Sequence, residues 1–176
     1  MLETARLTIR RFTTDDAPFV YALYNDPDFL HYIGDRGVHS VADARAYIEA
    51  GPIASYARHG FGLYVVELKS TGEPIGVCGI LKRDSLDAPD LGFAFLPDYR
   101  SRGYAGEAAR SVLAFARGTL RLTRILAITS PGNAISMALL RKLGFTLERM
   151  DPGTGAPGTT GFDTPVYVFG LMSAAP

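Results

Sequence analysis

The segment from Asp90 to Gly106 constrains the fold more than any other part of this chain. It begins with an apolar run, residues 91–96, that Pro97 ends, and this pattern predicts a strand. After Gly103, small and apolar residues recur at helical spacing: Ala105, Ala108, Ala109, Val112, Leu113 and Ala116. Such a stripe predicts a helix that packs closely on a sheet. A strand that leads through a short glycine-bearing turn into a helix favours a layered architecture.

Other patterns extend this unit along the chain. Alternating polarity predicts a first strand at 7–12, and helical spacing predicts helices from about residue 15 to 25 and from residue 40, the second kinked or divided at Gly51-Pro52. Further strands are predicted over 62–68, 75–81, 124–129, 146–150 and 166–172, with a turn at 69–72 and a helix over 134–143. This order predicts one α/β domain over residues 1–176, with a mixed sheet and helices on both faces.

Charge and cysteine content exclude several classes of function. Eighteen basic residues balance eighteen acidic ones, so no general attraction to nucleic acid or to an anionic membrane is expected. Cys78 is the only cysteine, which excludes an internal disulfide and a multi-cysteine metal site. The sequence contains no signal-peptide pattern and no run of eighteen apolar residues. We therefore expect a cytoplasmic protein that binds no metal.

The turn from Arg100 to Gly106 carries the clearest chemical signal. Unpaired N–H groups converge there at the positive end of a helix dipole, which suits a phosphate group. Gly103 allows the backbone to approach an anion, and Arg100 and Arg102 add guanidinium donors. Taken alone, the turn is equally consistent with a purely structural role. The sequence has neither a Walker loop nor a dinucleotide fingerprint here, which argues against nucleoside triphosphates and nicotinamide cofactors.

A second segment, residues 133–145, is by itself consistent with an ordinary capped helix. Asn133 lies at a predicted helix start, Ser136 lies almost one turn later, and Gly144 ends the helix before Phe145. By themselves, Asn133 is an ordinary N-cap and Ser136 is a serine that a helix tolerates.

Together, the two segments resemble the GNAT superfamily of acetyl-CoA-dependent N-acetyltransferases. Arg100-x-x-Gly103-x-Ala105 is similar to the family's pyrophosphate-binding turn, and Asn133 with Gly144-Phe145 is similar to its second conserved helix. The amino-terminal motifs resemble the branch that acetylates the amino termini of ribosomal proteins: Thr4-x-Arg6-Leu7-x-Ile9-Arg10, Asp15-Asp16 and Asn25-Asp26-Pro27. The resemblance spans about residues 2 to 172 and is weakest at 28–60 and 151–165.

The resemblance implies a mostly antiparallel, twisted sheet that is splayed in the middle, where acetyl-CoA binds. The pantetheine arm is expected beside Phe95 and Leu96, and Asn133 is expected to contact the pantetheine or cysteamine region. The pyrophosphate is expected at the turn and the helix start after it: Arg100, Arg102, Gly103, Tyr104, Ala105 and Gly106.

Direct acetyl transfer requires a neutral amine and a proton for the leaving thiolate. Asp90 is the candidate base, acting through water, although a solvated carboxylate explains it equally well; Glu148 is a weaker candidate. The resemblance implies that Ser136 acts as the thiolate's proton donor, because Leu140 occupies the position where many family members have a tyrosine acid. An α-amine, with a pKa near 8, is an easier acceptor than a lysine amine.

The sequence leaves three functions open. The first is N-acetylation of a primary amine, either on a protein amino terminus such as that of a ribosomal protein or on a small molecule. A non-catalytic acyl-CoA-binding module is the alternative, which Leu140 favours slightly, and a phosphate-binding domain unrelated to CoA is the third.

The sequence also allows a homodimer, formed by edge pairing or by exchange of the last strand. Residues 151–164 are either a lid near the substrate or a disordered connection.

Overall fold

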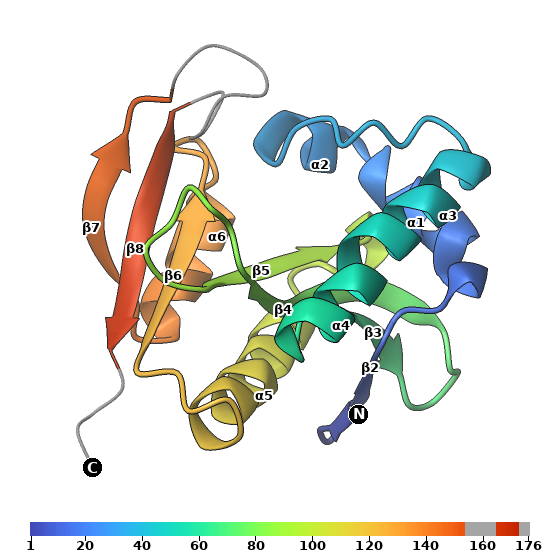
Figure 1. The fold of residues 1–176 in the computed structure, drawn as a ribbon, viewed down its shortest axis with the longest axis horizontal. Helices are drawn as coiled ribbons and strands as arrows, with labels where there is room; N and C mark the ends of the chain where they lie inside the picture. The colour runs from blue at the N-terminus through green and yellow to red at the C-terminus, as the bar shows by residue number, and fades with distance from the viewer. Residues whose placement is uncertain (154–164, 173–176) are drawn as a thin grey trace.

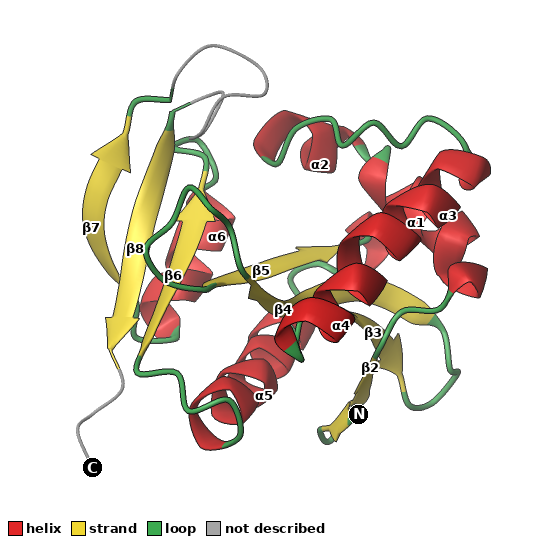
Figure 2. Ribbon diagram, in the orientation of Figure 1, coloured by secondary structure: helices red, strands yellow, loops and turns green. Residues whose placement is uncertain are grey.

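The structure is a computed structural model that describes residues 1–153 and 165–172 (Figures 1 and 2). Its strands are β1 (Leu2–Glu3), β2 (Leu7–Arg10), β3 (Leu63–Leu68), β4 (Pro74–Leu81), β5 (Asp90–Phe95), β6 (Arg124–Thr129), β7 (Thr146–Asp151) and β8 (Val166–Met172). Its α-helices are α1 (Ala17–Tyr24), α2 (Pro27–Tyr32), α3 (Val41–Ile48), α4 (Ala54–His59), α5 (Tyr104–Gly118) and α6 (Ala134–Lys142). Short 3₁₀ turns occupy η1 (Thr14–Asp16) and η3 (Pro97–Tyr99), and η2 (Glu49–Ile53) is a π-helix.

All these strands belong to one mixed sheet in the order β1-β2-β3-β4-β5-β6-β8-β7. Neighbouring strands are antiparallel except for β5 and β6, which are parallel. The predicted class, a mostly antiparallel sheet with helices, is therefore confirmed. None of the helices in the described ranges has the length and apolar character needed to cross a membrane.

Helices cover both faces of the sheet, as the sequence predicted (Figure 2). On β3, Val66 belongs to the core that includes the buried stripe of α5, whereas its neighbour Val65 belongs to the core beneath α1 and α3. The two valines point to opposite faces because side chains alternate along a strand. The predicted α5 stripe is confirmed, since Ala108, Val112 and Ala116 are fully buried.

The helix α2 departs from the pattern expected in the amino-terminal half, whereas the division at Gly51-Pro52 agrees with it. The sequence pattern does not predict α2, because Asn25-Asp26-Pro27 reads as the end of α1. The same residues also start α2, since the Asp26 carboxylate accepts a hydrogen bond from Phe29 N at 3.2 Å and Pro27 occupies the first turn. At Gly51-Pro52, where a kink or division was predicted, the π-helix η2 joins α3 to α4. Pro52 has no N–H to continue the α-helical pattern.

The centre of the sheet is splayed between β5 and β6. These strands share one register position, Asp90 opposite Leu126. Beyond it, β5 runs on to Phe95 and β6 to Thr129, and the two strands diverge (Figure 1). The gap between them opens toward the turn that leads into α5.

Candidate functional site

The turn before α5 forms an anion-binding nest. Ser101 and Gly103 both have positive φ, +58° and +83°, while Arg102 between them does not. Alternating backbone handedness directs successive N–H groups to one side, which creates a concave site for an anion. The first hydrogen bond of the helix joins Glu107 N to Gly103 O at 3.1 Å. Within the described chain, the amides of residues 102–106 donate to no group of the protein, so they are available to a ligand.

The first strands attach directly to this nest through Arg6. Its Nε and Nη2 each lie 2.7 Å from Glu107 Oε2, and its Nη1 donates to Arg102 O at 3.1 Å. Its guanidinium also lies 4.4 Å above the Tyr104 ring. Thr4 Oγ1 donates to Glu107 Oε1 at 2.6 Å. Burial alone would raise the pKa of Glu107, but the hydrogen bonds from Thr4 and Arg6 produce a net lowering. Glu107 is therefore an ionised, fully engaged carboxylate at the start of α5.

Arg100 and Arg102, both predicted phosphate ligands, have different surroundings. Arg100 Nε donates to Phe95 O at 2.8 Å, and its two terminal nitrogens form ion pairs with Asp26 and Asp28 at the start of α2. The Arg102 side chain is exposed, and it forms no hydrogen bond or ion pair with any residue of the described ranges. Arg102 is thus placed to meet an anion, whereas Arg100 connects the end of β5 to α2.

At the end of β5, the backbone N–H of one residue faces the gap between β5 and β6. Leu96 N donates to Ile75 O of β4 at 3.0 Å, so the Leu96 amide is not available to a ligand. The polar backbone groups of Phe95, one position earlier, point to the opposite edge of the strand, toward the gap. Since Phe95 O already accepts from Arg100, the Phe95 N–H is the group left for a ligand. Of the two predicted pantetheine positions, Phe95 therefore has the suitable backbone geometry.

The predicted residues of α6 lie at its first turn. Asn133 is the N-cap, and its Oδ1 accepts a hydrogen bond from Ser136 N at 3.0 Å. This leaves the Asn133 amide NH₂ and the half-buried Ser136 hydroxyl as polar groups at the helix start. Leu140, by contrast, is fully buried in the core between the sheet and the helices.

Asp90 lies at the closed end of the gap and is fully buried. Its side chain shares a face of β5 with Ala94, which packs in the core under α1 and α3. Arg83 Nε lies 3.0 and 3.1 Å from the two carboxylate oxygens. Burial raises the pKa of Asp90, and the Arg83 guanidinium offsets this only in part. The weaker candidate, Glu148, forms an ion pair with Arg124 at 2.6 Å.

Sequence reasoning did not identify the roles of Arg6, Glu107 or Arg83. Antiparallel pairing of β4 with β5 provided a signal for Arg83, because it aligns Leu81 with Asp90 and so brings the residues after Leu81 close to that carboxylate. No comparable signal paired Arg6 with Glu107, which are 101 positions apart in the chain.

Comparisons with known proteins agree with this geometry. Residues 6–146 match the acetyltransferase (GNAT) domain family. The chain is 28% identical over 169 residues to the uncharacterized N-acetyltransferase YoaA of Bacillus subtilis, covering 95% of this chain and 94% of YoaA. It is similar to the crystal structure of an acetyltransferase from Agrobacterium tumefaciens, with a TM-score of 0.78, 27% identity and coverage of 98% and 94% of the two chains.

A ribosomal-protein-S5-alanine acetyltransferase from Vibrio fischeri shares the fold, with a TM-score of 0.77, 18% identity and coverage of 97% and 94%. Acetyl-CoA is the cosubstrate of GNAT enzymes, and the open amides of the nest fit its pyrophosphate. The family match covers most of the chain, so this protein belongs to the GNAT family of acetyltransferases.

Proposed function

We propose that this chain transfers the acetyl group of acetyl-CoA directly to a primary amine, on a protein amino terminus or on a small molecule. The observation that carries the proposal is the position of the nest at the open end of the gap between β5 and β6. A diphosphate on the amides of residues 102–106 directs the attached arm into that gap, beside the Phe95 N–H. Acetyl-CoA supplies the activated thioester when it is bound.

The residues of the chain then have separate tasks. The nest amides and Arg102 hold the phosphates, and the Asn133 NH₂ is available for an amide oxygen of the pantetheine arm. Ser136 donates a hydrogen bond to the departing thiolate. Leu140 has no ionisable group and is sealed in the core, so it cannot serve as the acid.

Asp90 accepts the proton of the acceptor amine through a bridging water molecule. Because Arg83 engages both of its oxygens, Asp90 is better placed to orient a water molecule than to bind the amine directly. An amine whose pKa is near 8 needs only this modest help at neutral pH.

Thiol release from acetyl-CoA with a panel of amines and amino-terminal peptides tests the proposal. We expect turnover with at least one acceptor, and Ser136→Ala should lower kcat by about tenfold to a hundredfold with little change in the KM for acetyl-CoA. Ala138→Ser, a change of similar size at an exposed position of the same helix, is the control and should leave kcat unchanged.

The second candidate, a non-catalytic acyl-CoA-binding module, is favoured by the buried Leu140 in place of an acid. Calorimetry separates the two functions. Micromolar binding of acetyl-CoA without thiol release from any acceptor would identify the module, whereas no binding at millimolar acetyl-CoA would exclude both.

A further inference from the structure

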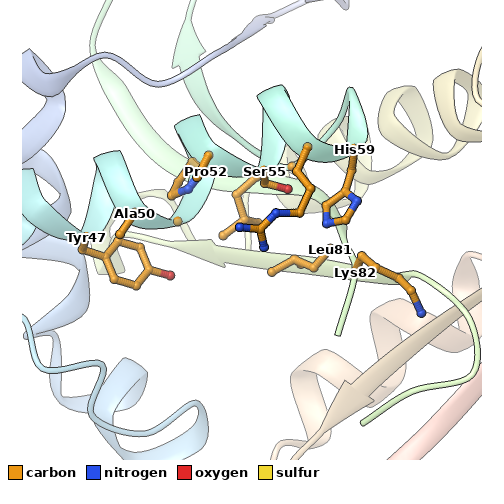
Figure 3. A pocket seen from close by; sticks show the side chains of 12 residues that line it. Tyr47, Ala50, Pro52, Ser55, His59, Leu81 and Lys82 are labelled. Atoms are coloured by element: carbon orange, nitrogen blue, oxygen red, sulfur yellow. The ribbon is translucent and has the colours of Figure 1, made fainter. Parts of the chain in front are cut away.

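A pocket of about 210 Å³ lies between α4 and the end of β4 (Figure 3). Leu63 and Leu81 form part of its lining, and Leu81 is the register partner of Asp90. Both leucines also approach Gly92 on β5, where an added Cβ would lie 2.6 Å from Leu81 Cδ1 and 3.6 Å from Leu63 Cδ2. The pocket therefore borders the segment of β5 that carries the candidate base.

A tyrosine pair lies at the Tyr47 end of the pocket. Tyr47 lines the pocket, and its hydroxyl lies 3.3 Å from that of Tyr24. Burial raises the pKa of Tyr24, and the positive charges of Arg36 and Arg83 act in the opposite direction. Tyr24 belongs to the same core as Ala94 of β5, which shares a strand face with Asp90, so the tyrosine pair connects the pocket to that face of β5.

The charge of the pocket is positive. The cations Arg58 and Lys82 line it beside the His59 ring, and no carboxylate is among its lining residues in the described chain. Figure 3 shows His59 and Lys82 together, at the end away from Tyr47. Lys82 Nζ donates one hydrogen bond to Leu86 O at 3.3 Å, which leaves its other N–H groups for a ligand. The nearby carboxylate of Asp90 is already paired with Arg83.

We propose that this pocket binds an anionic group of the acceptor, a carboxylate or a phosphate, and that the acceptors are small primary amines carrying such a group. This inference rests on the proposed function, since it names the class of its acceptor. A polyamine would bring several positive charges to a cationic pocket and gain no partner there. The same cations favour the neutral form of an amine held nearby, so they also reduce the need for a strong base.

Matched acceptors test the inference with the wild-type chain. Thiol release is measured with β-alanine against β-alaninamide, with O-phosphoethanolamine against ethanolamine, and with spermidine. Rates are compared per fraction of neutral amine, because an anionic group also changes the pKa of the amine itself. We expect kcat/KM to be about tenfold or more higher for the anionic member of at least one pair. The pair that shows the larger ratio distinguishes a carboxylate from a phosphate.

Two variants assign the preference to the pocket. Arg58→Gln and Lys82→Gln should each lower kcat/KM for the preferred anionic acceptor by about tenfold and leave its uncharged partner unaffected. Arg45→Gln removes an exposed cation of α3 that does not line the pocket, so it should change neither rate. The KM for acetyl-CoA should remain unchanged in all three variants.

Other outcomes separate this inference from the proposed function. Equal or better turnover of the uncharged amines, of spermidine, or of peptides regardless of their charge would overturn the inference but leave acetyl transfer in place. A preference that Arg58→Gln and Lys82→Gln do not reduce would also overturn it. Thiol release with none of these acceptors and none of the amino-terminal peptides would overturn the proposed function and the inference with it.

Discussion

The guanidinium of Arg6 donates to the carbonyl oxygen of Arg102 and so orients the peptide that joins Arg102 to Gly103. In a trans peptide the C=O and N–H groups point in opposite directions. Because Arg6 holds the carbonyl, the Gly103 N–H points away from Arg6 and into the nest. Arg6 also neutralises Glu107, whose negative charge would otherwise oppose a phosphate at the start of α5.

Replacing Arg6 with Gln should therefore weaken acetyl-CoA binding. We expect the KM for acetyl-CoA to rise about tenfold, with kcat at saturation within about threefold of wild type, because one charge-assisted contact contributes roughly 1.5 kcal/mol. Lys69→Gln is the control, since it removes an exposed ion pair with Glu3, 3.0 Å long, near the same strands. If kcat fell while the KM stayed constant, Arg6 would have another role.

Asp16 joins the start of α1 to β2. Arg10 donates to both of its oxygens at 2.7 and 2.8 Å, and Thr13 N donates to Oδ2 at 2.8 Å. Burial acts to raise the pKa of Asp16, but these hydrogen bonds outweigh it and lower the pKa below its ordinary value of 3.8. A carboxyl with a lowered pKa stabilises the fold above its unfolded pKa and loses that contribution as the pH falls through its folded pKa.

The variant Asp16→Asn should lower the free energy of unfolding by about 2 kcal/mol at pH 7. Its effect should be smaller at pH 3, which lies below the ordinary pKa of 3.8, because the unfolded chain then already binds this proton. Urea unfolding at pH 7, 5 and 3 measures both differences, and Asp35→Asn, at an exposed carboxylate, should change stability by less than about 0.5 kcal/mol. A deficit that grew toward acid pH would contradict this account of the pKa.

Arg100 joins α2 to the end of β5. Asp26 is the N-cap of α2 and Asp28 lies in its first turn, and both pair with the guanidinium that also donates to Phe95 O. The last residue of α2, Tyr32, lies near the turn before α6, because a Cβ on Gly132 would be 3.9 Å from its ring. The helix α2 thus connects the segments that follow β5 and β6.

Variants of the two arginines of the turn should consequently differ. Arg102→Gln should raise the KM for acetyl-CoA severalfold and weaken its salt dependence, since an exposed cation near a phosphate is lost. Arg100→Gln should chiefly raise the KM for the acceptor and lower stability, because it leaves Asp26, whose side chain is 8% exposed, without its cation. Initial rates at several salt concentrations, with each substrate varied in turn, measure these effects. If the two variants raised the KM for acetyl-CoA equally, Arg100 would contact the phosphate directly, as the sequence predicted.

The elements differ in how well their sequences predicted them. The strands from β2 onward and α5 have clear alternating, apolar or helical patterns, and the predicted strand ranges agree with the structure to within a few residues. The six-residue helix α2 is too short to show a period, and the two-residue β1 is formed only through pairing with β2. Likewise, the Arg100 motif identified the turn, but the partners of Arg100 depend on where α2 lies in space.

The sheet consists of two parts that meet at β5 and β6. The strands β1 to β5 pair continuously on one side, and β6, β8 and β7 pair on the other, while one register position joins the parts. An extended ligand in the gap would add backbone hydrogen bonds where the sheet lacks them. Ligand binding should therefore stabilise the contact between the two parts of the sheet.

This coupling predicts a specific response to ligands that lack part of the cosubstrate. Acetyl-CoA at about 100 times its Kd should stabilise the chain by about 2.7 kcal/mol, which corresponds to roughly 5–10 °C in Tm for a chain of this size. In hydrogen exchange, acetyl-CoA should protect both the amides of residues 102–106 and the Phe95 N–H. ADP has a diphosphate but no pantetheine arm, so it should protect the turn and leave Phe95 unchanged. Equal protection of Phe95 by both ligands would mean that the nest alone tightens the sheet, and protection confined to segments away from β5 and β6 would place the cosubstrate outside the gap.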